Sequence, residues 1–269
     1  MKHFGLTIGE DVVLVNSKLT TTALDTWQHD SAGAHLNYDG RLQLLVSGGS
    51  TIHTDEITPT PKAIAALPIM GGAFGHLFHQ RGALVIHGTT VACSAGRQIV
   101  LSGPTAHGKS TTAAAALVMG DFGLVADDLT VVDDPTRPVV RHGPAQLRLW
   151  PDTVEAVGLC PADYPLVHPE NSKVWVSVDA AKNGTLVAML ALERGTETAL
   201  SLLSGSQAVM AVVRGSFVGH AKGFSDGARL LEQATKLAAQ VKIFRLTVAP
   251  DLTDLRPLVH ALNKALSWE

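Results

Sequence analysis

The chain has 269 residues, of which 46% are hydrophobic and 17% charged, with a formal net charge of −3. This composition predicts a folded globular protein, since a disordered chain is poorer in apolar residues and richer in charge. The small negative charge disfavours nucleic acid or an anionic membrane as a partner. Cys93 and Cys160 lack the C-x-x-C spacing and the paired histidines of a zinc site. They suit two free thiols in a reducing cytoplasm or a single disulfide.

The beginning of the chain, MKHFGLTIGEDVVLV, has acidic residues where a signal peptide has its apolar run. The longest apolar stretch, residues 63–78, is interrupted by Pro68 and by glycines, and it is too short for a clean membrane span. We therefore expect a soluble cytoplasmic protein that does not insert into a membrane.

The first part of the chain reads mainly as strands. Short apolar runs at 2–8, 11–16 and 41–47 are separated by turn residues, which is typical of strands. Residues 61–81 predict a helix with a weak point at Gly71-Gly72. After it come 83–88 and 89–94, predicted as two strands joined by a tight turn, and then a strand over 96–103.

The alanine-rich segment 109–120 predicts a strong helix that ends at Gly120, and a single buried strand is expected over 122–134. A proline-rich loop covers 160–173. The remaining prediction comprises strands at 174–179, 185–194, 198–204 and 242–249 and helices at 151–158, 204–213, 225–240 and 251–266. This alternation predicts an α/β fold with extra β-strands. We expect one domain over 1–269, with a β-rich lobe (1–82), a P-loop core (83–133) and a second lobe (134–269).

Residues 103–110 read G-P-T-A-H-G-K-S and match the phosphate-binding pattern G-x-x-x-x-G-K-S between a predicted strand and a predicted helix. The glycines let backbone N–H groups face phosphate oxygens, and the helix N-terminus adds partial positive charge. Lys109 would reach the β- and γ-phosphates, and the Ser110 hydroxyl would bind Mg²⁺. His107 points to solvent or touches the nucleotide. The predicted nucleotide-binding residues are Gly103, Pro104, Thr105, Ala106, His107, Gly108, Lys109, Ser110 and Thr111.

Asp127 and Asp128 follow the apolar run FGLVA, one helix and one turn after the loop. A returning strand of that length would bring both carboxylates back beside the loop. One carboxylate suffices for Mg²⁺. The other could accept a proton from an attacking hydroxyl, which predicts phosphoryl transfer.

Residues 83–133 resemble the catalytic domain of bacterial HPr kinase/phosphorylase, and the resemblance is weaker beyond them. His87-Gly88, the G-x-x-x-x-G-K-S loop and the V-A-D-D strand occur in the same order. The resemblance implies a fold shared with phosphoenolpyruvate carboxykinase and transfer of a phosphoryl group from ATP to a serine hydroxyl. It further implies that Lys109 and Ser110 hold phosphate and Mg²⁺, that Asp127 is the base, that Asp128 supports the metal and that His87 lies beside the aspartates. The roles of Asp127 and Asp128 could be exchanged.

The sequence departs from that family in several places. Only about 80 residues precede the similar region, so the regulatory domain of the full-length enzymes is not expected. Thr111 stands where the family usually has glutamate, and the downstream phosphorylase signature is not found, which makes phosphorolysis and HPr itself doubtful. Shorter relatives include kinases that phosphorylate the C-terminal serine of lasso-peptide precursors, so a peptide acceptor is plausible. HPr-type kinases form hexamers, which allows a homo-oligomer.

A kinase needs further cations near the transferred group, and the candidates are Arg148, Lys173, Lys222 and above all Arg214. Arg214 opens a glycine-rich stretch that could cover the site. His76 and His79 have H-x-x-H spacing but no accompanying carboxylate pattern, so no metal is expected there. Trp150 and Trp175 are expected in the core. The predicted function is an ATP- and Mg²⁺-dependent serine kinase acting on a protein or peptide. The alternatives are a kinase for a sugar or an amino acid and a non-catalytic nucleotide-binding regulator, and the phosphoryl donor could also be GTP or pyrophosphate.

Overall fold

The structure is a computed structural model and describes residues 2–3, 6–7, 12–19, 26–218 and 221–268. The chain forms a mixed α/β protein with several sheets, divided into two compact units. Unit 1 comprises 1–85 and 217–228, and unit 2 comprises 86–216 and 229–269. In the described ranges no helix is both long enough and apolar enough to span a membrane.

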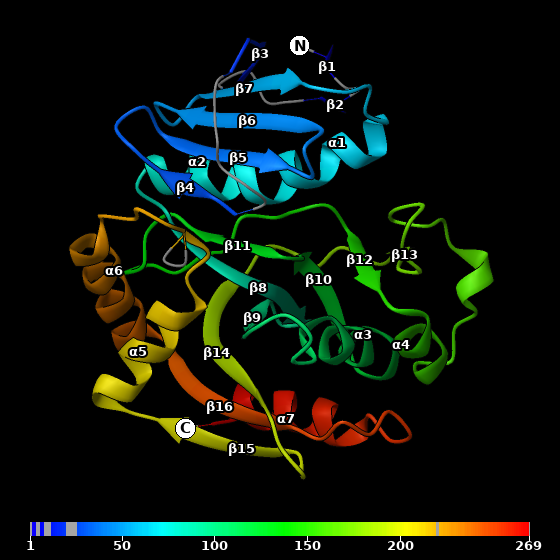
Figure 1. Cartoon of the computed structure of the whole chain (residues 1–269). Coiled ribbons are helices and arrows are strands. Elements are labelled where there is room, and N and C mark those ends of the chain that lie inside the picture. The colour runs from blue at the N-terminus through cyan, green and yellow to red at the C-terminus, as the bar shows by residue number, and fades with distance from the viewer. Residues whose placement is uncertain (1, 4–5, 8–11, 20–25, 219–220, 269) are drawn as a thin grey trace. The chain divides into compact units, whose positions relative to one another are not determined.

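Unit 1 is built on a five-stranded sheet in the order β3-β7-β6-β5-β4, along which its helical segment lies (Figure 1). Its core is formed by apolar side chains of the sheet, such as Leu44 and Val46, together with Ile69 and Leu77 of the helical segment. Its elements are β1 (Lys2–His3), β2 (Leu6–Thr7), β3 (Val13–Asn16), β4 (Gln28–His29), β5 (Ala34–Tyr38), β6 (Leu42–Ser47), β7 (Thr51–Glu56), α1 (Lys62–Pro68), a π-helical turn η1 (Ile69–Ala73) and α2 (Phe74–Gln80).

The helix predicted over 61–81 contains the π-helical turn at its predicted weak point. Pro68 lies at the end of α1, where its ring removes a backbone donor. Gly71 and Gly72 lie within the turn that follows. A Cβ on Gly72 would come within 2.7 Å of Trp27 Cε2, so glycine is needed there for the indole to pack against the backbone.

Unit 2 is built on a seven-stranded sheet in the order β10-β8-β9-β14-β16-β15, with β11 paired to β8. Helices α3 and α7 pack against each other on this sheet, and their alanines and leucines form the main core (Figure 1). Its elements are β8 (Leu84–Cys93), β9 (Arg97–Ser102), α3 (Lys109–Met119), β10 (Phe122–Ala126), β11 (Leu129–Val132), β12 (Gln146–Leu149), α4 (Pro151–Ala156), a 3-10 turn η2 (Pro161–Asp163), β13 (Val174–Ser177), β14 (Thr185–Arg194), β15 (Ala199–Leu203), α5 (Gly205–Gly215), α6 (Gly227–Gln240), β16 (Lys242–Val248) and α7 (Arg256–Leu266).

The tight turn predicted between 83–88 and 89–94 is wrong, because these residues form the one continuous strand β8. Gly88 is the reason for the misreading. Gly88 pairs with Ser102 of β9, and a Cβ at this position would lie 2.7 Å from the carbonyl oxygen of Leu101. The glycine therefore serves a close approach of two backbones and not a reversal of the chain.

The strand predicted over 122–134 is interrupted and forms β10 and β11. The break falls at Asp127-Asp128, where Asp128 has a left-handed backbone with φ of 63°. The helix predicted from residue 251 begins only at Arg256, because Asp251 and Asp254 fold the preceding loop onto itself. Strands β4, β5 and β7 lie in segments where no strand was predicted.

Candidate functional site

The G-x-x-x-x-G-K-S segment connects β9 to α3, as the sequence pattern predicts. Gly103 has φ of 151° and Gly108 has φ of 91°, and the non-glycine residue Ala106 has φ of 63°. These conformations turn the loop sharply and explain both glycines. No side chain caps the N-terminus of α3, where Gly108 is the capping residue. The first-turn N–H groups of α3 therefore remain suited to binding an anion.

Lys109 begins α3 and folds back over the loop. Its Nζ donates hydrogen bonds to the carbonyl oxygens of Gly103 at 2.7 Å and Pro104 at 3.0 Å. The residue is 7% exposed. The pKa of the Lys109 ammonium is lowered to about 8, mainly by burial; Asp127 opposes this change and the charge of Lys173 contributes to it. A lysine whose positive charge is incompletely compensated is a favourable partner for phosphate.

The two aspartates lie at the end of β10, at the same edge of the sheet as the loop. Strand β8 pairs antiparallel with both β9 and β10, so β9 and β10 run parallel on either side of it. Ser102 pairs with Gly88 and Ala126 pairs with Thr90, so both strands end at the same level. The strand order therefore brings the loop and the aspartates to one edge of the sheet.

Asp127 is fixed by two donors from other strands. The Thr89 hydroxyl donates to Asp127 Oδ1 at 2.7 Å, and the backbone N–H of Arg148 donates to Oδ2 at 3.4 Å. Burial raises the pKa of the Asp127 carboxyl above its ordinary value, while the Thr89 hydrogen bond and the charges of Arg148 and Lys173 oppose the rise. A positioned carboxylate with a raised pKa is a suitable proton acceptor.

Asp128 differs from its neighbour in exposure and in partner. Its side chain is 31% exposed and forms an ion pair with the Arg148 guanidinium. Its carbonyl oxygen accepts a hydrogen bond from the Gly88 N–H at 3.1 Å. Left-handed backbone on a residue other than glycine is uncommon and is often found at functional positions. Asp128 and Ala106 are two of the three such residues in the described ranges.

The hydroxyl of Ser110 and the carboxylate of Asp128 are hard oxygen donors of the kind that Mg²⁺ prefers. Within the described residues no group of three or more His, Cys, Asp or Glu side chains is arranged to hold a metal by itself. A magnesium ion held by these two oxygens would take its other ligands from nucleotide phosphates and water.

The other predicted site residues are distributed over both units. His87 lies on β8 directly before Gly88, and its carbonyl oxygen accepts a hydrogen bond from Ser102 Oγ at 3.2 Å. Arg214 lies in the last turn of α5, and the next residue, Gly215, approaches Ser102. Lys222 belongs to unit 1, where its backbone forms a bridge with Gln28. Part of the glycine-rich stretch after Arg214, at 219–220, lies outside the described residues.

His107 folds back on its own loop, since its Nδ1 lies 3.0 Å from the carbonyl oxygen of Thr105. The assignment of Trp150 to the core is wrong, because its side chain is 47% exposed. Trp150 follows the last residue of β12 and carries the Lys173 ammonium 4.9 Å above its ring. Trp175 is half-buried on β13.

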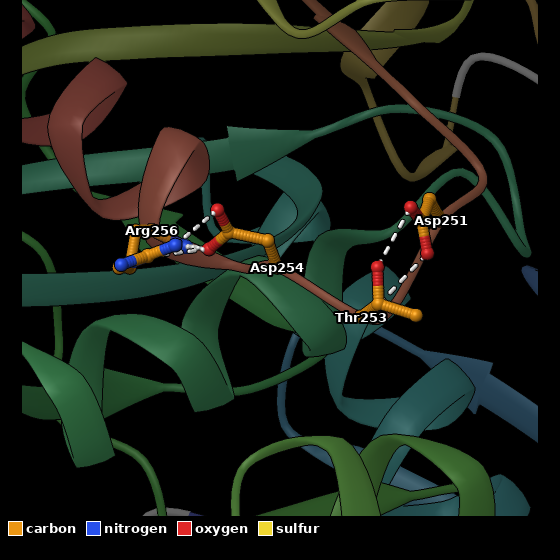
Figure 2. Close-up of polar contacts among 4 residues, drawn as sticks. All are labelled: Asp251, Thr253, Asp254 and Arg256. Atoms are coloured by element: carbon orange, nitrogen blue, oxygen red, sulfur yellow. Dashed lines mark hydrogen bonds and ion pairs between the residues drawn. The ribbon is translucent and has the colours of Figure 1, made fainter.

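A cavity of about 390 Å³ adjoins the phosphate-loop segment. The loop between β16 and α7 forms one wall and is braced by its own hydrogen bonds, from Thr253 to Asp251 and from Arg256 to Asp254 (Figure 2). Trp150 also lines the cavity. The lining residues are Ala106, Gly108, Thr111, Trp150, Asp152, Thr153, Arg194, Val248, Ala249, Pro250, Asp251, Leu252, Leu255 and Leu258.

Two contacts in this region were missed by sequence reasoning. Thr89 holds Asp127, and Arg194 donates from Nε to the carbonyl oxygen of Ala106 at 3.0 Å. Arg194 ends β14, which is parallel to β9 and β16. The signal for Arg194 is thus its place at the end of a parallel strand, where functional side chains gather.

The fold and the site define a mixed α/β protein with a glycine-containing strand-to-helix loop beside a pair of aspartates. No protein-family model matches the sequence. No curated protein is significantly similar to it either.

Proposed function

We propose that this protein is a P-loop phosphotransferase that moves the γ-phosphate of ATP to a serine hydroxyl of a protein or peptide, on a core of the HPr kinase and phosphoenolpyruvate carboxykinase type. The observation that carries the proposal is the Asp127 carboxylate. Thr89 and the Arg148 backbone hold it at the edge of the sheet where β9 ends and the phosphate-loop segment begins. A nucleotide-binding module without catalysis would not need a buried carboxylate there.

The cavity beside the loop supports a nucleoside triphosphate as the donor. Its lining includes apolar side chains of the 248–258 segment and the exposed Trp150, which suits a nucleobase. It reaches Gly108 and Thr111, at the start of α3 where phosphates would bind. Pyrophosphate would leave this cavity unused.

The proposed reaction assigns one step to each side chain. The acceptor hydroxyl oxygen forms a bond to the γ-phosphorus while the bond from that phosphorus to the β–γ bridging oxygen breaks, and ADP leaves with the electron pair. The hydroxyl proton moves to the Asp127 carboxylate. Lys109 holds the β- and γ-phosphates, and Ser110 with Asp128 would hold Mg²⁺, which shields the phosphate charge. His87 and Arg214 stay predictions as site residues.

The decisive experiment is intact mass spectrometry of candidate acceptors after incubation with MgATP, using HPr, serine-containing peptides and small hydroxyl metabolites. Asp127→Asn is expected to reduce phosphate transfer by a factor of about 100 to 10,000 while MgATP affinity changes little, because only proton removal is lost. Asp133→Asn is the matched control, since Asp133 is exposed and paired with Arg141.

Phosphate on a serine, lost in Asp127→Asn and kept in Asp133→Asn, supports the proposal and names the substrate class. Phosphate on a metabolite alone would replace the peptide acceptor with a small molecule. Nucleotide binding that is indifferent to Asp127→Asn, with no transfer to any acceptor, would leave a nucleotide-binding regulator.

A further inference from the structure

Two cations at the paired ends of β12 and β13 each lie over a tryptophan ring. The antiparallel register places Arg148 opposite Trp175 and Leu149 opposite Val174. The Arg148 guanidinium lies 5.7 Å from the centroid of Trp175, and the Lys173 ammonium lies 4.9 Å from the centroid of Trp150. Such stacking fixes the direction of a long flexible side chain at little cost in hydration.

Both cations belong to the charge cluster around the aspartates. Arg148 pairs with Asp128 and its backbone holds Asp127. Lys173 is half-buried, and its pKa is lowered first by burial and then by Arg148, while Asp127 opposes the change. Lys173 also lowers the pKa of Lys109, so the two ammonium groups lie close enough to repel each other.

The cluster carries more positive than negative charge. Lys109, Arg148 and Lys173 share it with the two carboxylates of Asp127 and Asp128. Two of the cations have polar partners within the protein, since Arg148 is bound to Asp128 and Lys109 to loop carbonyls. Lys173 has the Trp150 ring and no ion pair with a carboxylate in the described part of the chain. A held, partly desolvated ammonium in a cluster with excess positive charge is suited to an anion.

We infer that Lys173, held on the Trp150 ring, binds the γ-phosphate together with Lys109 and neutralises the charge of the phosphoryl group during transfer. The inference rests on the proposed function and adds a second phosphate-binding lysine to it. The γ-phosphate is the group assigned to Lys173 because Lys173 directly precedes β13, whose register places Trp175 opposite Arg148. Arg148 in turn holds Asp127, the proposed base at the attacked phosphorus, through its backbone N–H. Trp150 also lines the cavity beside the loop, so one indole ring connects the proposed nucleoside pocket to the γ-phosphate.

This assignment predicts a difference between two nucleotides. Loss of the Lys173 charge is expected to weaken MgATP binding by a factor of about 10 or more and to change MgADP binding by less than about twofold, because only MgATP presents the γ-phosphate. The rate of phosphate transfer at saturating MgATP is also expected to fall by a factor of about 10 or more, since charge on the moving group is less compensated.

The test is to measure Kd for MgATP and MgADP by calorimetry on the full chain and on Lys173→Met, Lys173→Arg and Lys236→Met. Methionine keeps an apolar contact with the Trp150 ring, and thermal unfolding of the variant checks that the fold is retained. Lys173→Arg keeps the charge and is expected to restore most of the MgATP affinity. Lys236 is an exposed residue of α6 paired with Glu232, and Lys236→Met should bind like the unmodified protein.

An equal loss for both nucleotides, or no loss for either, in folded Lys173→Met would overturn the role of Lys173 while leaving the proposed function standing. An unmodified protein that binds neither nucleotide would overturn the proposed function itself, and the role of Lys173 would fall with it.

Discussion

Each unit contains a cluster of partly buried titratable side chains. The cluster in unit 1 is uncharged, whereas the cluster in unit 2 contains ion-paired groups. In unit 1 the His76 ring contacts Trp27 at 4.4 Å between centroids and lies 3.1 Å from His29 Nε2 through its Nδ1. Burial lowers the pKa of His76 to about 3, and the neighbouring histidines lower it further, so the ring is neutral. In unit 2 the cluster instead pairs opposite charges, since Arg148 binds Asp128, and the charges of Arg148 and Lys173 oppose the rise in the pKa of Asp127 that burial causes.

The difference shows which cluster is part of the core and which is a site. A neutral histidine among aromatic rings behaves as a core side chain, and its buried, unpaired Nε2 costs less than a buried charge would. Charges that are retained despite burial reduce stability, and such a cost is common where a site must bind charge. Substitutions should therefore affect the two clusters in opposite directions.

Among the three changes that compare the two clusters, the largest effect is expected for Lys109→Met in unit 2. MgATP affinity should fall by a factor of about 10 to 100, because a hydrogen bond to a charged group contributes about 1.5–3 kcal/mol. The melting temperature should stay the same or rise, since a desolvated ammonium is removed. Calorimetry and thermal unfolding measure the two quantities on one sample. A variant that binds MgATP normally, or that loses stability, would contradict the comparison.

A smaller effect is expected from acid on unit 1. The unfolded chain binds a proton at His76 below its ordinary pKa of 6.5, while the folded protein binds it only near 3. Stability is therefore fully present above that ordinary value and is lost as the pH falls toward the folded value. From about pH 7 to about pH 5 the free energy of unfolding should decrease by about 2 kcal/mol through this one ring.

Urea denaturation at the two pH values measures this decrease, and His76→Gln should remove most of it because an amide does not titrate there. His260→Gln, on an exposed position of α7, serves as the control and should keep the decrease. His29 adds to the slope in the same direction, since burial also lowers its pKa. A slope that His76→Gln leaves unchanged would show that the cluster is not a neutral core.

The smallest effect is expected at the π-helical turn that precedes His76 in the chain. Gly72→Ala should lower the free energy of unfolding by about 1–2 kcal/mol, because the new Cβ would overlap the Trp27 indole that packs on His76. Gly71→Ala is the matched control, with open space around its added Cβ and an expected change within about 0.5 kcal/mol. Chemical denaturation of both variants compares them directly, and equal values would contradict the packing argument.

Much of the site's local geometry follows from the sequence. The G-x-x-x-x-G-K-S pattern, the alanine-rich run after it and the apolar run before Asp127 predict a strand, a loop, a helix and a strand, and the structure has them in that order. Each of these signals acts over a few residues, through backbone conformations that glycine permits and through helix propensity. The kinase activity stays a prediction at this level, as do the roles of His87 and Arg214.

The tertiary structure alone decided the strand order and the partners of the aspartates. Gly88 was misread as a turn because its role is set by the Leu101 carbonyl on a neighbouring strand. Thr89, Arg148 and Arg194 reach their partners across strands that are distant in sequence. By itself the sequence determined the local conformations, since these depend on neighbouring residues. The surroundings of Asp127 and Lys173 depend on non-local pairing and burial, which no short stretch of sequence encodes.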